Sequence, residues 1–390
     1  MKAMERDPVK SHKKNQVKLL FIIIFFLLSS LLTTKRVQAY TGLPEDIDYT
    51  EIQEVIDDVM GKGNEFNFNS YITRMVNGEE RFSISAVGNQ LLLSIKGEIK
   101  ANIGTFVSLI TIALIAALFT NLSMAFKNNN VSETGYYITY LLLFGLLISS
   151  FIIASRIAAT AIGSILDFMK AMVPTYFMSV AFTSGATTSL VYYEAALTLI
   201  TLVDVLIIKI IIPMINFYLV IMLANNLSKE DMLSRLADLF STAISWLLKS
   251  MLAAVIGFNA IQGLIVPVAD QVKRSVFLKA SEAIPGIGDA LGGVTETVLG
   301  AGVLLKNAIG VAGLITILVM SAVPFLKLLM ITIVYKVGCA ALQPISDKRF
   351  IECISASAKS AAMLVQTVFV GAVLFLLSIT IVAVTSGSVK

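Results

Sequence analysis

The hydrophobic positions of the chain follow three patterns along its length. A first apolar run, Leu19–Leu32, comes after a basic stretch, and polar and apolar positions then alternate at helical spacing up to residue 102. From residue 103 onward the apolar runs reach the 20 or so residues that a membrane helix needs. The pattern predicts a signal peptide (1–39), an acidic helical segment (40–102) and a polytopic membrane domain (103–390).

The first 39 residues have the pattern of an export signal. Lysines and an arginine precede the apolar run, and Val37-Gln38-Ala39 supplies the small residues that a signal peptidase recognises. We predict cleavage before Tyr40. The alternative is a retained N-terminal anchor, and in both cases the following residues begin outside the cytoplasm.

The segment 40–102 predicts short amphipathic helices. Ile52, Val55 and Ile56 begin an apolar face at helical spacing, and the pattern is repeated from Phe68 to Val76. The segment holds eleven acids and five bases, a net charge of −6, which suits the non-cytoplasmic side of a membrane. About sixty residues bury only a thin core alone, so the apolar faces are expected to pack on the membrane domain or on a partner.

The membrane domain opens with two predicted spans, Ile103–Met124 and Tyr136–Ser155. Residues 156–183 are apolar but contain charges and a proline, and they fit a re-entrant or interfacial helix as well as a span. Residues 188–226 predict either one long tilted helix or a tight pair.

Further along the chain, 228–240 predicts a short amphipathic helix and 241–266 another span. Ala308–Leu342 fits one broken helix or two, and Ala361–Val384 is the last predicted span. The fold class is therefore an all-α, polytopic helical membrane protein with five to seven spans. The basic loop around Lys348 favours the cytoplasm for that loop and the opposite side for the C-terminus.

Composition supports this fold class and excludes several functions. Of the 390 residues, 56% are hydrophobic and 14% charged, whereas soluble domains carry about a quarter charged residues. The net charge of +4 comes from the first 39 residues, which contribute +6 and leave −2 for the rest, so nucleic acid is not an expected partner. The single histidine, His12, lies in the signal, which excludes histidine-based catalysis or metal binding in the mature chain. Cys339 and Cys353 form no metal or redox motif.

Ionisable residues inside apolar stretches are candidates for function because they are costly in lipid. Asp204 and Lys209 are five positions apart, about 140° around an α-helix, so we expect them not to pair. Asp167 and Lys170 are three apart and share a face. These charges either pair and reach the membrane surface or line a polar path.

A Gly-rich, more polar segment occupies residues 268–307, and we predict that residues 283–313 are the functional centre, as a re-entrant hairpin. Its glycines do not fit a dinucleotide-binding motif, no Walker A motif is present, and no cofactor is expected. Gly288 and Gly292 have the small-xxx-small spacing of closely packed helices. The candidate functional or packing residues of the chain are Pro285, Gly286, Gly288, Gly292, Lys306, Asn307, Gly310, Gly313, Asp204 and Lys209.

Several stretches resemble the stage III sporulation protein AE family of endospore-forming bacteria. They include Ala283–Ala290, Leu305–Leu314, Pro324–Lys327 and Ala341–Arg349, with further similar segments upstream at Met172–Phe177 and Gln262–Pro267. The resemblance covers roughly residues 40–390 and rests on the order of these segments.

The resemblance implies a role in endospore formation, in the mother-cell membrane around the forespore. It implies partners: the other stage III A sporulation membrane proteins, including a secretion-type ATPase, and the forespore stage II protein Q. The resemblance implies that these proteins form a secretion-like transenvelope channel, and membrane lipids are a further expected partner. The leading hypothesis is a non-enzymatic platform or export-core subunit of that channel. The alternative is an autonomous small-solute permease with a path lined by Glu194, Asp204, Lys209 and Lys306.

Overall fold

The computed structural model describes residues 48–60, 67–76, 129–184, 186–227, 231–282, 288–344 and 346–385, with five positions between 103 and 111. The elements in these residues are α2 (Thr50–Met60), α3 (Phe68–Val76), α5 (Asn129–Ser184), α6 (Ala186–Val203), the π-helix η1 (Asp204–Ile211), α7 (Ile212–Leu227), α8 (Ser234–Glu282), α9 (Gly288–Leu342) and α10 (Lys348–Thr385). The predicted signal peptide and most of the predicted span Ile103–Met124 lie outside the described residues.

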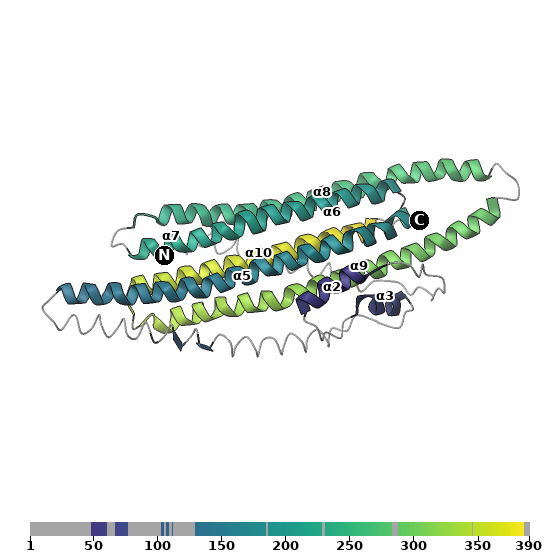
Figure 1. Ribbon diagram of the computed structural model, residues 1–390. Coiled ribbons are helices and arrows are strands. Elements are labelled where there is room, and N and C mark those ends of the chain that lie inside the picture. The colour runs from purple at the N-terminus through teal and green to yellow at the C-terminus, as the bar shows by residue number, and fades with distance from the viewer. Residues whose placement is uncertain are drawn as a thin grey trace, which may run out of the picture.

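The long helices run side by side in an elongated bundle (Figure 1). α8 and the continuous helix α6–η1–α7 lie along the upper edge of the view, α5 and α10 run through the middle, and α9 follows the lower edge. The C-terminal ends of α7 and α9 and the N-terminal ends of α8 and α10 lie at one end of the bundle, which we call the turn end. The opposite end, where α5 passes into α6, is called the far end.

Five helices are long and apolar enough to cross a membrane, which confirms an all-α, multi-pass membrane protein. The candidate spans within the described residues are Tyr137–Ala181, Ser189–Leu227, Ser234–Phe258, Gly302–Leu342 and Lys348–Thr380. In α10, 67% of the apolar membrane-spanning stretch is buried inside the bundle, against 22% in α8, so α10 is the central helix.

Small residues let the neighbouring helices approach α10 closely. Ala356, Ser357 and Ser360 are all buried, and the two serine hydroxyls donate to carbonyls four residues earlier, at 3.1 and 2.9 Å. Hydroxyls satisfied within their own helix leave no polar group exposed to lipid or to the core. α10 begins after Asp347, whose Oδ1 accepts a hydrogen bond from the Arg349 backbone N–H at 2.9 Å.

The structure joins segments that the sequence pattern separates. Residues 156–183 continue the helix that begins before Tyr136, so they are neither a re-entrant helix nor a separate span. Residues 188–226 form one long helix, and Ala308–Leu342 lies within one continuous helix. The short helix predicted at 228–240 is instead the start of α8, which runs on to Glu282.

Prolines lie inside these continuous helices, and two of them lie within predicted spans or apolar runs that the sequence pattern divided. Pro174 lies in α5 and Pro324 in α9, where each ring removes one backbone N–H donor from the helix. The usual expectation is a break, and it was the reason for considering broken helices in the sequence. Neighbouring helices cover both positions: Val173 is 1% exposed, and Phe325 contacts the ring of Phe369 on α10 at 6.2 Å. Packing therefore holds each helix continuous through its proline.

The acidic segment packs on the bundle through a small aromatic cluster. Phe68 at the start of α3 is fully buried, with its ring 5.8 Å from that of Tyr49 and 6.3 Å from that of Phe168 on α5. Gln53 on α2 accepts a hydrogen bond from the Phe68 N–H at 2.8 Å, which fixes α3 against α2. The two helices thus bury their apolar faces within the chain, one of the two expectations from the sequence.

Replacing Phe68 with alanine is expected to detach α2 and α3 from the bundle. Removing a fully buried phenylalanine costs about 3–5 kcal/mol, and two short helices have little other packing to offset this loss. Limited proteolysis of the purified protein should then cleave within residues 48–76 much faster than in the wild type. Asn69→Ala on the exposed face of α3 is the matched control and should be cleaved at the wild-type rate. Equal cleavage rates in both variants would contradict the prediction.

Candidate functional site

The π-helix η1 forms an ion pair that the sequence analysis excluded. The Lys209 Nζ lies 2.8 Å from the Asp204 Oδ2, and both residues belong to η1. The prediction was wrong because it assumed 3.6 residues per turn. A π-helix repeats its hydrogen bonds at i→i+5, and this wider turn brings residues five apart to the same face.

The pair lies on the outside of the bundle, with the side chains of Lys209 and Asp204 63% and 36% exposed. Asp167 and Lys170 pair on α5 as predicted, at 2.9 Å, and are also exposed. Glu194 is exposed on α6. These ionisable groups face away from the bundle interior and therefore do not line a path through it.

Replacing Asp204 with asparagine is expected to cost less than about 1 kcal/mol of stability, because the pair is exposed. The matched control is Asp167→Asn, which breaks a pair of similar length in a regular α-helix. Exchanging the charges, Asp204→Lys with Lys209→Asp, should recover the stability lost by either single change. Thermal melting of the detergent-solubilised protein measures the stability of each variant. A loss of several kcal/mol in the single variant, with no recovery on exchange, would contradict the prediction.

One face of α9 carries three of the candidate residues predicted from the sequence. Lys306, Gly310 and Gly313 follow one another at i, i+4 and i+7, the spacing of one helix face. A Cβ added at Gly313 would lie 2.4 Å from the Met172 Sδ, and one at Gly310 would lie 3.4 Å from the Tyr176 ring. The two glycines thus let α9 pack closely against α5.

Tyr176 of α5 and Ile379 of α10 extend this contact to a third helix. The Tyr176 hydroxyl donates to the Ile379 backbone carbonyl on α10 at 3.5 Å, and the Ile379 Cδ1 lies 3.7 Å from the Cβ position of Gly313. α5, α9 and α10 therefore meet around the Gly310–Gly313 turn of α9.

Lys306 is the one charged side chain among those described that is completely buried, at 0% exposure. On α9, Lys306 lies one turn before Gly310, and the neighbouring Leu305 and Ile309 are also buried. Ser179 of α5, also fully buried, donates its hydroxyl to the Tyr176 carbonyl at 2.6 Å near the same level. A fully buried cation is costly, and such positions are candidates for function.

The predicted re-entrant hairpin at 283–313 is absent from the part of that segment that the structure describes. Residues 288–313 belong to the continuous helix α9, so Gly288 and Gly292 lie in its first turns. Pro285 and Gly286 fall outside the described residues. Asn307 is exposed, about 100° around α9 from the buried Lys306. The prediction failed because a glycine-rich composition lowers helix propensity, but tertiary context overrides propensity.

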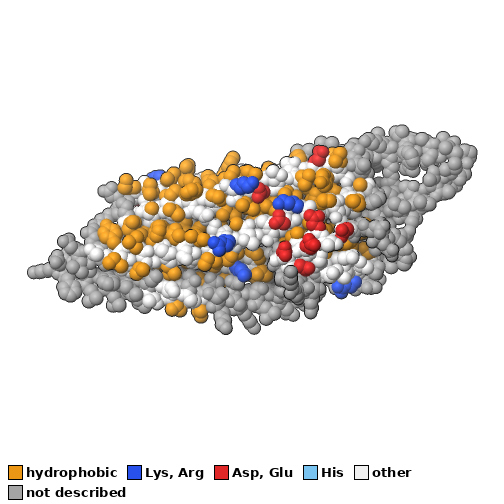
Figure 2. Space-filling view, in the orientation of Figure 1, with side chains coloured by type: hydrophobic (Ala, Val, Ile, Leu, Met, Phe, Trp, Pro, Cys, Tyr) orange, Lys and Arg blue, Asp and Glu red, His pale blue; other side chains and the backbone are white. Residues whose placement is uncertain are grey.

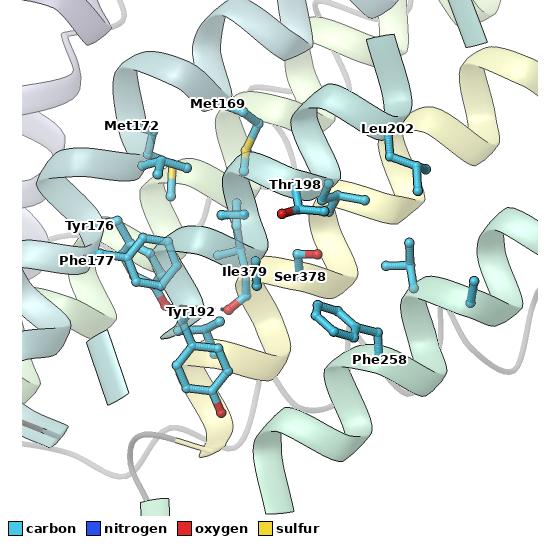
Figure 3. Close-up of a pocket in the computed structure, with 17 residues that line it drawn as sticks. Met169, Met172, Tyr176, Phe177, Tyr192, Thr198, Leu202, Phe258, Ser378 and Ile379 are labelled. Carbon is cyan, nitrogen blue, oxygen red and sulfur yellow. Dashed lines mark hydrogen bonds between the residues drawn. The ribbon is translucent and has the colours of Figure 1, made fainter. Parts of the chain in front are cut away.

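An apolar cavity of about 350 Å³ lies close to this contact and was not predicted (Figure 3). Met172 and Tyr176 of α5, Tyr192 of α6, Phe258 of α8 and Ile379 of α10 are among its walls. Figure 3 shows Phe258 and Leu202 on one side of the space and Tyr176, Phe177 and Tyr192 on the other. The cavity depends on side chains from four helices, and no local sequence signal marks it. Its lining suits an apolar group.

Comparisons with known proteins place these features in a family. The family model described as "Stage III sporulation protein AE" matches residues 66–386. A curated protein of that description from Bacillus subtilis (strain 168) is 26% identical over 318 residues, which cover 81% of this chain and 79% of that protein. No solved structure matches the chain.

Proposed function

The chain belongs to the stage III sporulation protein AE family, and from this premise we propose that it is a non-enzymatic membrane subunit of a sporulation-specific, secretion-like transenvelope channel. In this role it serves as the platform or export core. It sits in the mother-cell membrane around the forespore, with its N-terminal segment on the extracytoplasmic side.

The observation that carries the proposal is the length of the helices. α5 has 56 residues and α9 has 55, which at 1.5 Å per residue correspond to about 84 and 82 Å. A bilayer with its headgroups is about 40–45 Å thick. A bundle of such helices extends well beyond the membrane and offers partners a rigid surface there. This geometry suits a subunit that holds other proteins together across the space between two membranes.

The proposed partners are the other stage III A membrane proteins, among them a secretion-type ATPase, and the forespore stage II protein Q. In this arrangement the ATPase hydrolyses the nucleotide and this subunit anchors the assembly. The acidic helix α2 and the helix α3 are bound to the bundle on one side and leave a polar outer face, charged on α2, for contact with another subunit.

The alternative, an autonomous permease, has less support from the geometry. Its predicted path requires Glu194, Asp204, Lys209 and Lys306 to face a common interior space. Lys306 is fully buried, whereas the other three are exposed on the outside of the bundle.

Affinity purification of the tagged protein from sporulating cells in mild detergent, followed by mass spectrometry, tests the proposal. We expect the other stage III A proteins to be recovered with it in defined ratios. The control is an unrelated tagged polytopic protein expressed at the same stage, which should not recover them.

Recovery of the protein alone would contradict the platform role, provided that a known membrane complex survives the same detergent. Asp204→Asn then separates the two hypotheses further. The variant should abolish solute transport by a permease in vesicles, whereas a platform should show no transport to lose.

A further inference from the structure

Four cations from four different helices lie at the same height along the bundle. The Cβ position of Gly371 on α10 is 2.4 Å from the Ile162 Cδ1 on α5 and 3.5 Å from the Ile207 Cδ1 on η1, so the three helices share this level. At 1.5 Å per residue, Arg156 lies about 9 Å from this shared level, toward the turn end. Lys209 lies about 3 Å from it in the same direction.

The two remaining cations fall within the same range. Phe325 on α9 contacts Phe369, which precedes Gly371 by two residues. This contact places Lys327 about 6 Å from the Gly371 level, toward the turn end. On α8, the Leu233 N–H donates to the Asn225 Oδ1 at 2.7 Å. Lys249 is sixteen residues from Leu233, as Lys209 is from Asn225, so these two lysines have equal height. We call the set the cation belt: Arg156, Lys249, Lys327 and Lys209, which also pairs with Asp204.

Between the cation belt and the turn end the bundle has the thickness of a bilayer core. Tyr137 and Arg156 are nineteen residues apart, about 28 Å, and Asn225 and Lys209 about 24 Å, against about 30 Å for hydrocarbon. Lysine and arginine side chains reach the remaining few ångströms toward the headgroups. Large apolar side chains are exposed in this part: Leu141, Leu142, Phe217, Leu239, Trp246 and Val337.

Two lysines in this part lie within about 10 Å, along the bundle, of its turn end. The Lys359 Nζ lies 5.0 Å from the centre of the Tyr218 ring, and Tyr218 is seven residues, about 10 Å, from Asn225. Lys336 is six residues, about 9 Å, from Leu342 at the end of α9. Both are within the reach of a snorkelling lysine.

Beyond the cation belt the bundle carries groups that need water. Phe168, about 18 Å past Arg156, holds α3 against α5, and the outward faces of α2 and α3 are polar. Glu51 and Glu54 on α2 are exposed there, as is Glu194 on α6. A bilayer at this height would place several exposed carboxylates in hydrocarbon. Figure 2 shows the same order, with a broad hydrophobic zone on the left, then basic side chains, then a group of acidic ones.

We propose that the cation belt binds the phosphate headgroups at one surface of the bilayer. The part of the bundle beyond it, with α2, α3 and the apolar cavity, stands in water. Headgroup phosphates are the occupant that fits because the belt runs across four helices at one height, and anionic lipid attracts each such cation. The proposal does not depend on the proposed sporulation function.

Cysteine accessibility tests the position of the surface. Single cysteines at Leu142, Phe217, Met178 and Leu190 start from equally exposed side chains, 56, 60, 56 and 58%. They are made in a chain with Cys339→Ser and Cys353→Ser, reconstituted in nanodiscs of phosphatidylglycerol and phosphatidylethanolamine and treated with a charged maleimide. Cysteines at 178 and 190 should react at least about tenfold faster than those at 142 and 217.

Faster reaction at 142 and 217, or equal rates at all four sites, would overturn the position of the surface. Each side of the proposed membrane surface carries two cysteine positions, on different helices. If size-exclusion chromatography shows that one variant is misfolded, the other position on that side still allows the comparison. Nanodiscs expose both membrane surfaces, so the result does not depend on orientation.

Lipid retention tests the headgroup contact itself. The variant Arg156→Gln with Lys327→Gln should co-purify with at least about twofold less phosphatidylglycerol than the wild type, measured by mass spectrometry. The matched control, Arg74→Gln with Lys170→Gln, removes two exposed cations beyond the belt and should retain the wild-type amount. Equal retention in the two variants would overturn the assignment of the belt to phosphate headgroups.

Discussion

Replacing Gly313 with leucine is expected to destabilise the bundle by about 1–3 kcal/mol, the usual cost of overpacking a close contact. The first added carbon already lies 2.4 Å from the Met172 Sδ and 2.6 Å from its Cε. Met172 is 1% exposed, so its side chain has little free space into which to move. Thermal melting of the detergent-solubilised protein should show a lower midpoint.

Gly145→Leu is the matched control for this prediction. Gly145 also lies in a long helix, but no heavy atom comes within 4 Å of its Cβ position. Its replacement should change stability by less than about 0.5 kcal/mol or increase it, because glycine is a poor helix former. In a Met172→Ala background, Gly313→Leu should cost much less than in the wild type, because the two changes share one space. Equal losses at positions 145 and 313 would refute the close-contact explanation.

Replacing Lys306 with methionine is expected to keep the protein folded while sporulation falls. Methionine conserves the length and volume of the side chain and removes a fully buried charge. Burying a cation costs stability, so one that is retained at full burial is a candidate functional group, and heat-resistant spores should decrease about tenfold or more.

Lys327→Met is the comparison for Lys306. Lys327 lies on the same helix but is half-buried, so its change should move stability by less than about 1 kcal/mol. A large loss of stability in Lys306→Met, or full sporulation by that variant, would show that the buried cation is a structural element only.

The sequence predicts the fold class and most apolar segments, because lipid imposes length and hydropathy on each span. It does not predict how these segments join. Pro174 and Pro324 are local signals for a break, whereas the continuity of α5 and α9 depends on neighbouring helices that no local pattern encodes.

The candidate site was predicted unevenly for the same reason. Gly310 and Gly313 were proposed as members of the Gly-rich segment 283–313 and lie at close contacts between helices. The Asp204–Lys209 pair was missed because its geometry belongs to a π-helix, which the 3.6-residue period does not describe. The cavity depends on side chains from four helices, and only the three-dimensional arrangement brings these together.

The unbroken course of α5 gives the molecule the mechanics of a lever. A rod about 84 Å long that tilts by about 10° about one end moves its other end by about 15 Å. A small change in the tilt of α5 within the lipid would therefore produce a large displacement of a partner bound at the far end. Pushing on the far end would apply torque directly to the lipid-embedded portion, with no flexible joint along α5 to absorb it.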